Sequence, residues 1–185
     1  DKDWRSYVVN ALYFQGIWAK KFDSKNTKPE DFTGVTGKRK VQMMHNYDNN
    51  NYCEYGGFEA IELPYGNGDY VMTVMISKSE DRLSPEVMSG IVSAMKKEYI
   101  SLGFPKFETE TDISEFTISL VKFDSVLHVA KINVDEEGTE AAAVTVIGDG
   151  AIAPNAPREL IFNQPFYYVI TQKTTGIILF VGYYC

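Results

Sequence analysis

The chain has 185 residues, of which 44% are hydrophobic and 14% are aromatic, and its formal net charge is -7. This composition is typical of one globular domain with its own core and excludes a disordered chain, while the acidic balance argues against a nucleic-acid partner bound on a basic face. No apolar run approaches the roughly 20 residues that a membrane-spanning helix needs, so we expect no membrane partner. Two cysteines are too few for a disulfide framework.

The N-terminal part of the chain predicts strands separated by polar segments. Residues 7–14 are β-branched or aromatic and apolar on both faces, which is typical of a buried central strand. Residues 26–37 have the composition of a loop, and residues 41–44 indicate a short strand. The asparagine-rich residues 46–51 indicate a polar turn.

A hairpin and one helix are predicted next. Residues 58–64 and 70–77 have strand composition, and Asn67-Gly68 between them favours the positive φ angles of a tight turn. Ser84 followed by Pro85 is a favourable helix start, so we expect a helix over residues 84–99. Side chains at spacings of four form its predicted apolar face, which we interpret as core packing: Val87, Ile91, Met95 and Tyr99.

Beyond Ser101 the chain is almost entirely β. Strands are expected at residues 102–109, 116–121, 126–134, 160–162, 166–171 and 177–184. Thr174-Thr175-Gly176 turns the last two strands into a hairpin. One helix beside many strands, mostly antiparallel because their connections are short, predicts an α+β fold.

The residues that catalysis or metal binding would need are absent as motifs. The two histidines, His45 and His128, form no His-Glu-x-x-His pattern, and the chain has no Gly-x-Ser-x-Gly sequence, so we expect no enzyme, no cofactor and no metal site. His128 lies in an apolar strand, where a buried imidazole needs a hydrogen-bond partner because an unmet polar group costs about 1–3 kcal/mol. Asn10 has the same need, and the two side chains could satisfy each other across a sheet.

The stretch from Asp135 to Thr145 has the most unusual composition in the chain. It combines acidic residues and a glycine with small and β-branched residues, and it lies between two strong strand segments. Consecutive carboxylates on an extended chain point alternately, so the acidic run is interpreted as solvated charge or an ion pair rather than a metal site. Small side chains beside β-capable neighbours predict a segment that can lie at the surface or enter a sheet.

Six sequence blocks in order resemble the serpin family over nearly the whole chain. They are Val9-Asn10-Ala11-Leu12-Tyr13-Phe14-Gln15-Gly16-Ile17-Trp18, Met43, Leu63-Pro64-Tyr65-Gly66, Pro105-Lys106-Phe107, Glu136-Glu137-Gly138-Thr139-Glu140-Ala141-Ala142-Ala143, and the closing pair Phe162-Asn163-Gln164-Pro165-Phe166 and Gly176-Ile177-Ile178-Leu179-Phe180-Val181-Gly182. The resemblance implies multi-stranded, mostly antiparallel sheets with few helices. It further implies a reactive loop able to insert as an extra strand.

The resemblance also implies how the chain is organised and which residues act. Residues 1–185 would be the C-terminal portion of a single serpin domain whose N-terminal helical portion is not in this chain, and residues 136–161 would be the hinge and reactive-centre loop. Asn10 and His128 match the buried pair of the family's shutter. Trp18, Lys106 and Glu136 match its breach, where the loop first enters the sheet. The implied hinge consists of Glu136, Glu137, Gly138, Thr139, Glu140, Ala141, Ala142 and Ala143.

The reactive bond is predicted from the spacing that the family shows beyond the hinge glutamate. Counting from Glu136 gives the bond between Ile152 and Ala153, with Ala151 and Pro154 as neighbours. Counting back from Phe162 gives Pro154, but proline is a poor acylating residue, so Ile152 is chosen. A small or medium apolar residue at this position suits an elastase-like or subtilisin-like protease.

The function implied is a suicide-substrate inhibitor of serine proteases, with cysteine proteases as a further target class, that traps the acyl-enzyme by loop insertion. The alternative is a non-inhibitory serpin-fold protein, a chaperone, carrier or storage protein, that a protease cleaves as a plain substrate. The expected partners are the target protease and the N-terminal part of the same domain. We expect a monomer that is secreted, although no signal peptide opens the chain.

Overall fold

The computed structural model describes residues 7–79, 82–112, 125–139 and 156–185. The elements in chain order are β1 (Tyr7–Tyr13), β2 (Gly16–Ile17), η1 (Ser24–Asn26), β3 (Lys28–Gly34), β4 (Gly37–Tyr55), β5 (Phe58–Tyr65), β6 (Tyr70–Ser77), α1 (Pro85–Ala94), β7 (Lys96–Pro105), β8 (Phe107–Asp112), β9 (Ser125–Val134), β10 (Gly138–Thr139), β11 (Arg158–Ile161), β12 (Phe166–Gln172) and β13 (Ile178–Tyr184). Many strands and, within the described ranges, a single α-helix confirm the α+β prediction.

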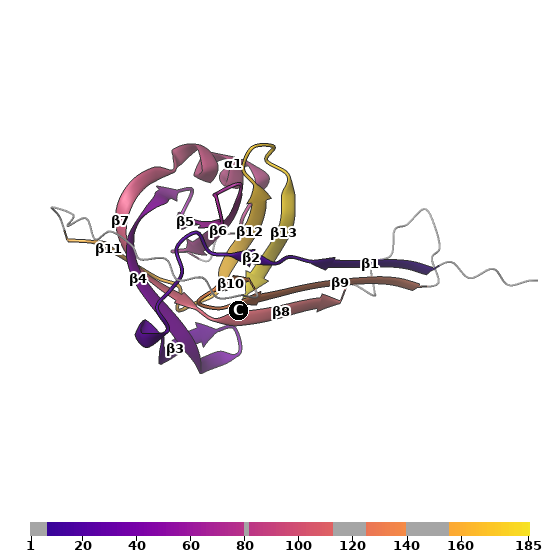
Figure 1. Ribbon diagram of the computed structural model, residues 1–185, viewed down its shortest axis with the longest axis horizontal. Coiled ribbons are helices and arrows are strands. Elements are labelled where there is room, and N and C mark those ends of the chain that lie inside the picture. Colours follow the sequence, from indigo (N-terminus) through magenta and orange to yellow (C-terminus); the bar gives the residue numbers. More distant parts are fainter. Residues whose placement is uncertain (1–6, 80–81, 113–124, 140–155) are drawn as a thin grey trace, which may run out of the picture.

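The strands form three sheets of very different size. The eight-stranded sheet has the order β11-β7-β4-β5-β6-β12-β13, with β3 paired to β4, and the three-stranded sheet has the order β1-β9-β8. In Figure 1 the large sheet curls on itself while β1, β8 and β9 run side by side away from it. The third sheet, β2 with β10, is small and joins segments more than a hundred residues apart in the sequence.

The polar turn predicted at residues 46–51 is wrong, because these residues lie inside the 19-residue strand β4. Their backbone pairs with β7 from Asn46, opposite Leu102, to Asn51, opposite Lys97. The loop predicted at residues 26–37 contains strand β3, which pairs antiparallel with β4 and buries Phe32. Local composition favours turns in both places, but the ladder hydrogen bonds of neighbouring strands outweigh that preference.

The predicted hairpin is confirmed, whereas the predicted helix is too long. Strands β5 and β6 pair antiparallel around a turn in which Gly66 and Gly68 have φ angles of 48° and 91°. Helix α1 begins as expected, since the Ser84 side chain accepts a hydrogen bond from the Val87 amide at 3.3 Å. It ends at Ala94 with Met95 as its C-cap, and the residues from Lys96 onward, including Tyr99, belong to β7 because they pair with β4.

The strand predicted at residues 102–109 is two strands, β7 and β8, which separate at Lys106. Strands β8 and β9 pair antiparallel, and β9 pairs parallel with β1. Within the described residues β1 is an edge strand of the three-stranded sheet, not the central strand expected from its apolar faces. The strand predicted at residues 116–121 lies outside the described residues.

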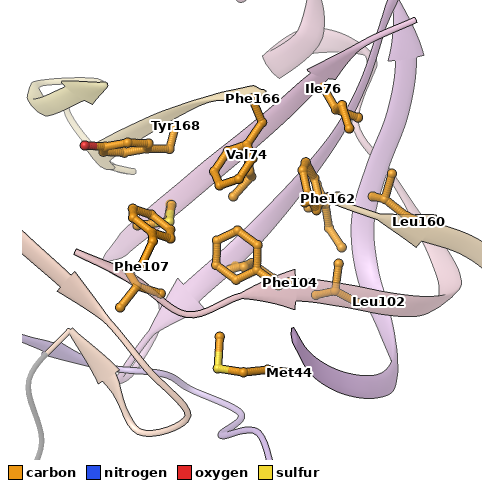
Figure 2. Close-up of a cluster of buried hydrophobic side chains, with 14 of the residues drawn as sticks. Met44, Val74, Ile76, Leu102, Phe104, Phe107, Leu160, Phe162, Phe166 and Tyr168 are labelled. Atoms are coloured by element: carbon orange, nitrogen blue, oxygen red, sulfur yellow. The ribbon is translucent and has the colours of Figure 1, made fainter. Parts of the chain in front are cut away.

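An aromatic cluster fills the interior of the large sheet. The ring centroid of Phe104 lies 5.8 Å from that of Phe107, 5.6 Å from that of Phe162 and 5.8 Å from that of Phe166. Figure 2 shows these rings converging from β7, β8, β12 and the segment that follows β11. Burial of each such ring contributes about 1.5–3 kcal/mol. Because Phe107 begins β8, this core also fixes where the three-stranded sheet leaves the large one.

Candidate functional site

The hinge turn, residues 135–138, links the end of β9 to β10. The Asp135 side chain accepts hydrogen bonds from the backbone amides of Glu137 at 2.9 Å and Gly138 at 3.2 Å. The Asp135 amide donates to the Gly138 carbonyl at 3.0 Å. These bonds reverse the chain immediately after β9, so the sequence beyond the turn starts back alongside the sheet.

Gly138 is the position in this turn that only glycine fits. Its φ is 142°, and a Cβ there would lie 2.1 Å from the Gly16 carbonyl oxygen and 2.7 Å from the Ile17 Cα. Gly138 pairs with Ile17 in the two-stranded sheet of β2 and β10. The backbones can approach this closely because Gly138 carries no side chain that would lie between them.

Glu136 binds two side chains from other parts of the chain. Its Oε2 accepts a hydrogen bond from Lys106 Nζ at 2.7 Å, and its Oε1 accepts one from the Thr27 hydroxyl at 2.7 Å. Burial opposes ionisation of this carboxyl, but the hydrogen bonds from Lys106 and Thr27 outweigh it, so the pKa of Glu136 lies below its ordinary value. Glu136 is therefore an ionised anchor that ties the turn to the start of β8 and to the segment before β3.

Trp18 is the second anchor of the hinge turn. Its indole Nε1 donates to the Asp135 carbonyl at 2.9 Å, and its backbone amide donates to the Glu137 carbonyl at 2.9 Å. The ring is buried and stacks on Tyr65, with ring centroids 4.4 Å apart and planes 14° from parallel. Glu137 also pairs with Lys21. The four residues of the hinge turn are thus held by side-chain hydrogen bonds, by backbone hydrogen bonds and by an ion pair.

Asn10 and His128 occupy opposite positions in neighbouring strands. In the parallel register of β1 and β9, Val9 pairs with Leu127 and Asn10 pairs with His128. Directly paired residues on neighbouring strands share a face of the sheet. The backbone therefore brings together the two positions assigned to the shutter, while their side chains lie outside what the structure describes.

The other predicted site residues are only partly described. The backbone of Thr139 belongs to β10. The remaining hinge residues and the predicted reactive bond lie outside the described residues, namely Glu140, Ala141, Ala142, Ala143, Ala151, Ile152, Ala153 and Pro154.

Sequence reasoning misses two residues that contact the hinge turn, Thr27 and Lys21, and the hydrogen bonds that Asp135 makes within the turn. The composition places Thr27 in a loop and Asp135 in solvated charge or an ion pair, and no motif includes Lys21. Only Asp135 carries a local signal, because an aspartate side chain often accepts a hydrogen bond from the backbone amide two residues later. Thr27 and Lys21 approach from more than 100 residues away in the chain, which no local pattern reports.

Nothing in the described ranges resembles a catalytic or metal centre. No group of three or more metal-ligating side chains occurs there. Cys53 is buried and free, and burial raises the pKa of its thiol to about 11, while Cys185 is exposed and free. No helix among the described residues is long and apolar enough to cross a membrane.

A family model described as "Serpin (serine protease inhibitor)" matches residues 1–117 and 107–185. The chain belongs to the serpin family. Curated relatives include an uncharacterized serpin-like protein of Methanosarcina mazei, 31% identical over 97% of this chain and 50% of that protein, and human Serpin B3, 31% identical over 95% of this chain and 54% of that protein. This serpin chain therefore spans about half the length of the curated relatives it matches.

Solved structures agree with this assignment. The native thermophilic serpin tengpin matches with a TM-score of 0.77 over 96% of this chain and 54% of that chain, at 22% identity, which shows the serpin fold alone. A structure described as a tumour suppressing serpin matches with a TM-score of 0.77 at 28% identity over 97% of this chain and 56% of that chain. The fold is thus of the protease-inhibitor type, and serpins are generally inhibitors rather than catalysts.

Proposed function

We propose that this chain is the inhibitory part of a serpin that traps serine proteases as a suicide substrate. The protease attacks the loop that follows the hinge turn and forms an acyl-enzyme. The freed loop then inserts as a strand between β1 and β9 and carries the bound protease with it. Loop insertion of this kind is an established property of inhibitory serpins, in which strand addition to a sheet releases stored strain.

The observation that carries the proposal is the parallel pairing of β1 with β9 next to the hinge turn. A chain that reverses after β9 runs antiparallel to β9, and it also runs antiparallel to β1 because those two strands are parallel. Insertion between them replaces one parallel ladder with two antiparallel ladders. Antiparallel pairing is slightly more stable per residue, and the number of ladders rises from one to two.

The sequence beyond the turn suits such a strand. On insertion Thr139, Ala141, Ala143, Thr145 and Ile147 would alternate onto one face. These side chains are small or β-branched, as a tightly packed sheet requires. Non-inhibitory members of the fold carry bulky, charged or proline residues in this segment, so the composition favours inhibition over the carrier or storage alternative.

The contacts that hold the hinge turn are suited to release. The Lys106 side chain is 37% exposed and that of Glu136 is 14% exposed, so water screens the ion pair and it is worth about 0–1 kcal/mol. Hydrogen bonds from Trp18 and Thr27 add about 1 kcal/mol each. Contacts of this size hold an uncut loop in place. The free energy gained by forming two new strand ladders exceeds the free energy lost by breaking these contacts.

We propose the bond between Ile152 and Ala153 as the reactive bond that the target protease attacks. The proposed target is an elastase-like or subtilisin-like serine protease, and cysteine proteases are a second class of target. Replacing Ile152 with arginine should shift the preferred target toward trypsin-like enzymes. Unchanged preference in inhibition rates against an elastase-like and a trypsin-like protease would assign the reactive bond elsewhere. The matched control is Ala142→Arg, which adds the same charge within the hinge.

The chain is proposed to act as the C-terminal portion of a serpin domain, joined to an N-terminal portion of similar size. Apolar side chains of β13 support this, since Ile178, Val181 and Tyr183 are 54%, 63% and 47% exposed, which is typical of a surface that another part of the protein covers. The whole domain is proposed to be monomeric and secreted, which light scattering and assay of the medium around its source cells test.

The direct test incubates the complete protein with an elastase-type protease and separates the products on a denaturing gel. A complex that survives the denaturant supports the trap, whereas complete cleavage without a complex supports the non-inhibitory alternative. Thr139→Arg should convert the inhibitor into a substrate, because the charge must enter the buried face on insertion. Glu140→Arg is the matched control, because position 140 faces outward on insertion, and it should keep the complex.

A further inference from the structure

A cavity of about 110 Å³ lies beside Trp18. Its apolar wall includes Trp18, Phe22 and Leu63, and its polar wall is a stretch of β4. One ordered water fills about 10–15 Å³ of such a cavity. The space is therefore several times larger than one bridging water needs.

One polar atom on each of two asparagine side chains in the cavity wall lacks a hydrogen-bond partner. Asn46 Oδ1 and Asn50 Nδ2 are buried and unpaired within the described part of the chain, and the Asn50 residue is only 7% exposed. Asp48 lies between them on the same face of β4 and is already paired with Lys20. The unmet groups are thus one acceptor and one donor, separated by a residue whose charge is satisfied.

The spacing of these two groups defines the shape of a ligand. Residues four apart on a strand are separated by roughly 13 Å. Two or three residues of an extended peptide span about 7–10 Å, and one hydrogen bond at each end closes the remaining distance. A peptide backbone also presents N–H donors and C=O acceptors along its length, which are the two groups that Asn46 and Asn50 require.

We propose that this cavity binds a short extended peptide of two or three small apolar residues through its backbone. A peptide N–H donates to Asn46 Oδ1, and a peptide C=O accepts from Asn50 Nδ2. Small apolar side chains of the peptide pack on Trp18, Phe22 and Leu63. The site recognises the backbone of the peptide through hydrogen bonds, so it selects peptides that are extended and have small side chains rather than a particular sequence.

Occupancy of the cavity has a consequence that rests on the proposed inhibitory function. Trp18 forms the cavity wall and also donates to the Asp135 carbonyl. A peptide packed on Trp18 stabilises the arrangement in which the hinge turn is held. Saturating peptide should therefore slow formation of the protease complex.

The experiment titrates the full-length protein with acetyl-dialanine methylamide. Isothermal calorimetry gives the affinity, and in a Trp4→Phe background Trp18 is the one tryptophan that residues 1–185 contribute to the fluorescence, so a fluorescence change that a Trp18→Phe variant lacks is assigned to the cavity. We expect a saturable fluorescence change. Asn46→Ala and Asn50→Ala should each weaken binding about five- to tenfold, the value of one hydrogen bond, without lowering the melting temperature.

A chemical control assigns the donor. The analogue has every amide N–H replaced by N–CH₃. It should bind the unsubstituted protein more weakly than the parent peptide does. In Asn46→Ala the analogue and the parent peptide should bind with equal affinity. Tyr47→Ser is the matched protein control, since Tyr47 is exposed on the opposite face of β4, and its affinity should be unchanged. Absence of a saturable change, or equal affinity in both asparagine variants and the parent, overturns the site and leaves ordered water as its occupant. The titration contains no protease, so its failure is distinct from failure of the proposed inhibition.

Discussion

At the scale of single residues, the hinge turn depends on a few contacts from distant parts of the chain. Glu136 and Trp18 each make two hydrogen bonds there, and Gly138 allows the close approach of two backbones. Local sequence identifies the turn as unusual because of its glycine and its acidic run. It does not identify Thr27 or Lys21, because a side chain that arrives through tertiary folding leaves no trace in the neighbouring sequence.

Loss of the Glu136 carboxylate should lower stability in a pH-dependent way. The pKa of Glu136 is held below the ordinary value of 4.5 despite partial burial, through hydrogen bonds from Lys106 and Thr27. The unfolded state then binds more protons, so this contribution is present above the unfolded pKa and is lost as pH falls through the folded pKa. Glu136→Gln should cost about 1 kcal/mol at neutral pH and little in acid.

The measurement is urea unfolding across a pH series, compared with the unsubstituted protein. Glu159→Gln is the matched control, because Glu159 is an exposed glutamate of β11, and it should leave the profile unchanged. A Glu136→Gln protein with the same loss of stability at every pH would contradict an ionised anchor.

Gly138→Ala should be more damaging than a glycine substitution at a comparable φ. Gly37 has a φ of 128° with no atom within 4 Å of a Cβ, whereas Gly138 has a φ of 142° and the Gly16 carbonyl at 2.1 Å. Gly37→Ala should cost about 1 kcal/mol through backbone strain alone. Gly138→Ala should cost at least about 1 kcal/mol more through the steric clash, measured by chemical denaturation. Equal costs at the two positions would show that β2 and β10 separate easily.

At the scale of elements, strands with alternating or uniform apolar character can be predicted from sequence and polar ones cannot. The hairpin of β5 and β6 has both a turn signal and strand composition, so its predicted bounds agree with the structure almost to the residue. Strand β4 carries polar residues through Asn51, and only its pairing with β7 and β5 makes that stretch a strand. Helix α1 ends early for the same reason, because β4 recruits the residues after Met95 into β7.

Strand β11 should depend on Arg158 more than its short length suggests. Arg158 pairs with Glu54 at 2.7 Å and with Glu98 at 3.1 Å, and it lies 5.1 Å from the centre of the Tyr52 ring. The charged side chains are nearly half exposed, so Arg158→Met should cost only about 0–1 kcal/mol overall. Locally, hydrogen exchange of the β11 amides should accelerate about two- to fivefold.

Lys96→Met is the control for that measurement, because it removes a positive charge from β7 but none of the contacts to β11. Exchange of β11 should be unchanged in this variant. Unchanged exchange in Arg158→Met would mean that backbone pairing with β7 alone holds the strand.

At the scale of the whole molecule, the three-stranded sheet is the part that the proposed loop insertion would change. Strands β1 and β9 form a parallel pair at the edge of the described structure, and the hinge turn lies at the end of β9. The large sheet is fixed by an aromatic core that spans β7, β8 and β12. The proposed insertion of a strand between β1 and β9 therefore acts on the three-stranded sheet, whose strands β8 and β9 share this core with the large sheet.

Cleavage of the loop in the complete protein should raise its thermal stability. Two antiparallel ladders formed on insertion contribute several kcal/mol, and since each kcal/mol shifts the melting temperature by about 2–4 °C, the rise should be on the order of 10 °C. Calorimetry of the intact and nicked proteins measures it. Nicked Thr139→Arg is the control and should show no rise, and a nicked parent protein without a rise would contradict insertion.

The sequence by itself determined the family, the β-rich fold and the hairpins, and it predicted a short list of residues around the hinge. These follow from local composition, from turn glycines, and from the order of short motifs along the chain. Only the tertiary structure decided that polar residues 46–51 lie in a strand, that Thr27 and Lys21 contact the hinge turn, and that β1 runs parallel to β9. Each of these depends on backbone pairing or side-chain contact between segments distant in sequence. The stabilising free energy comes from the distant segment that a residue contacts rather than from the local preference of the residue itself.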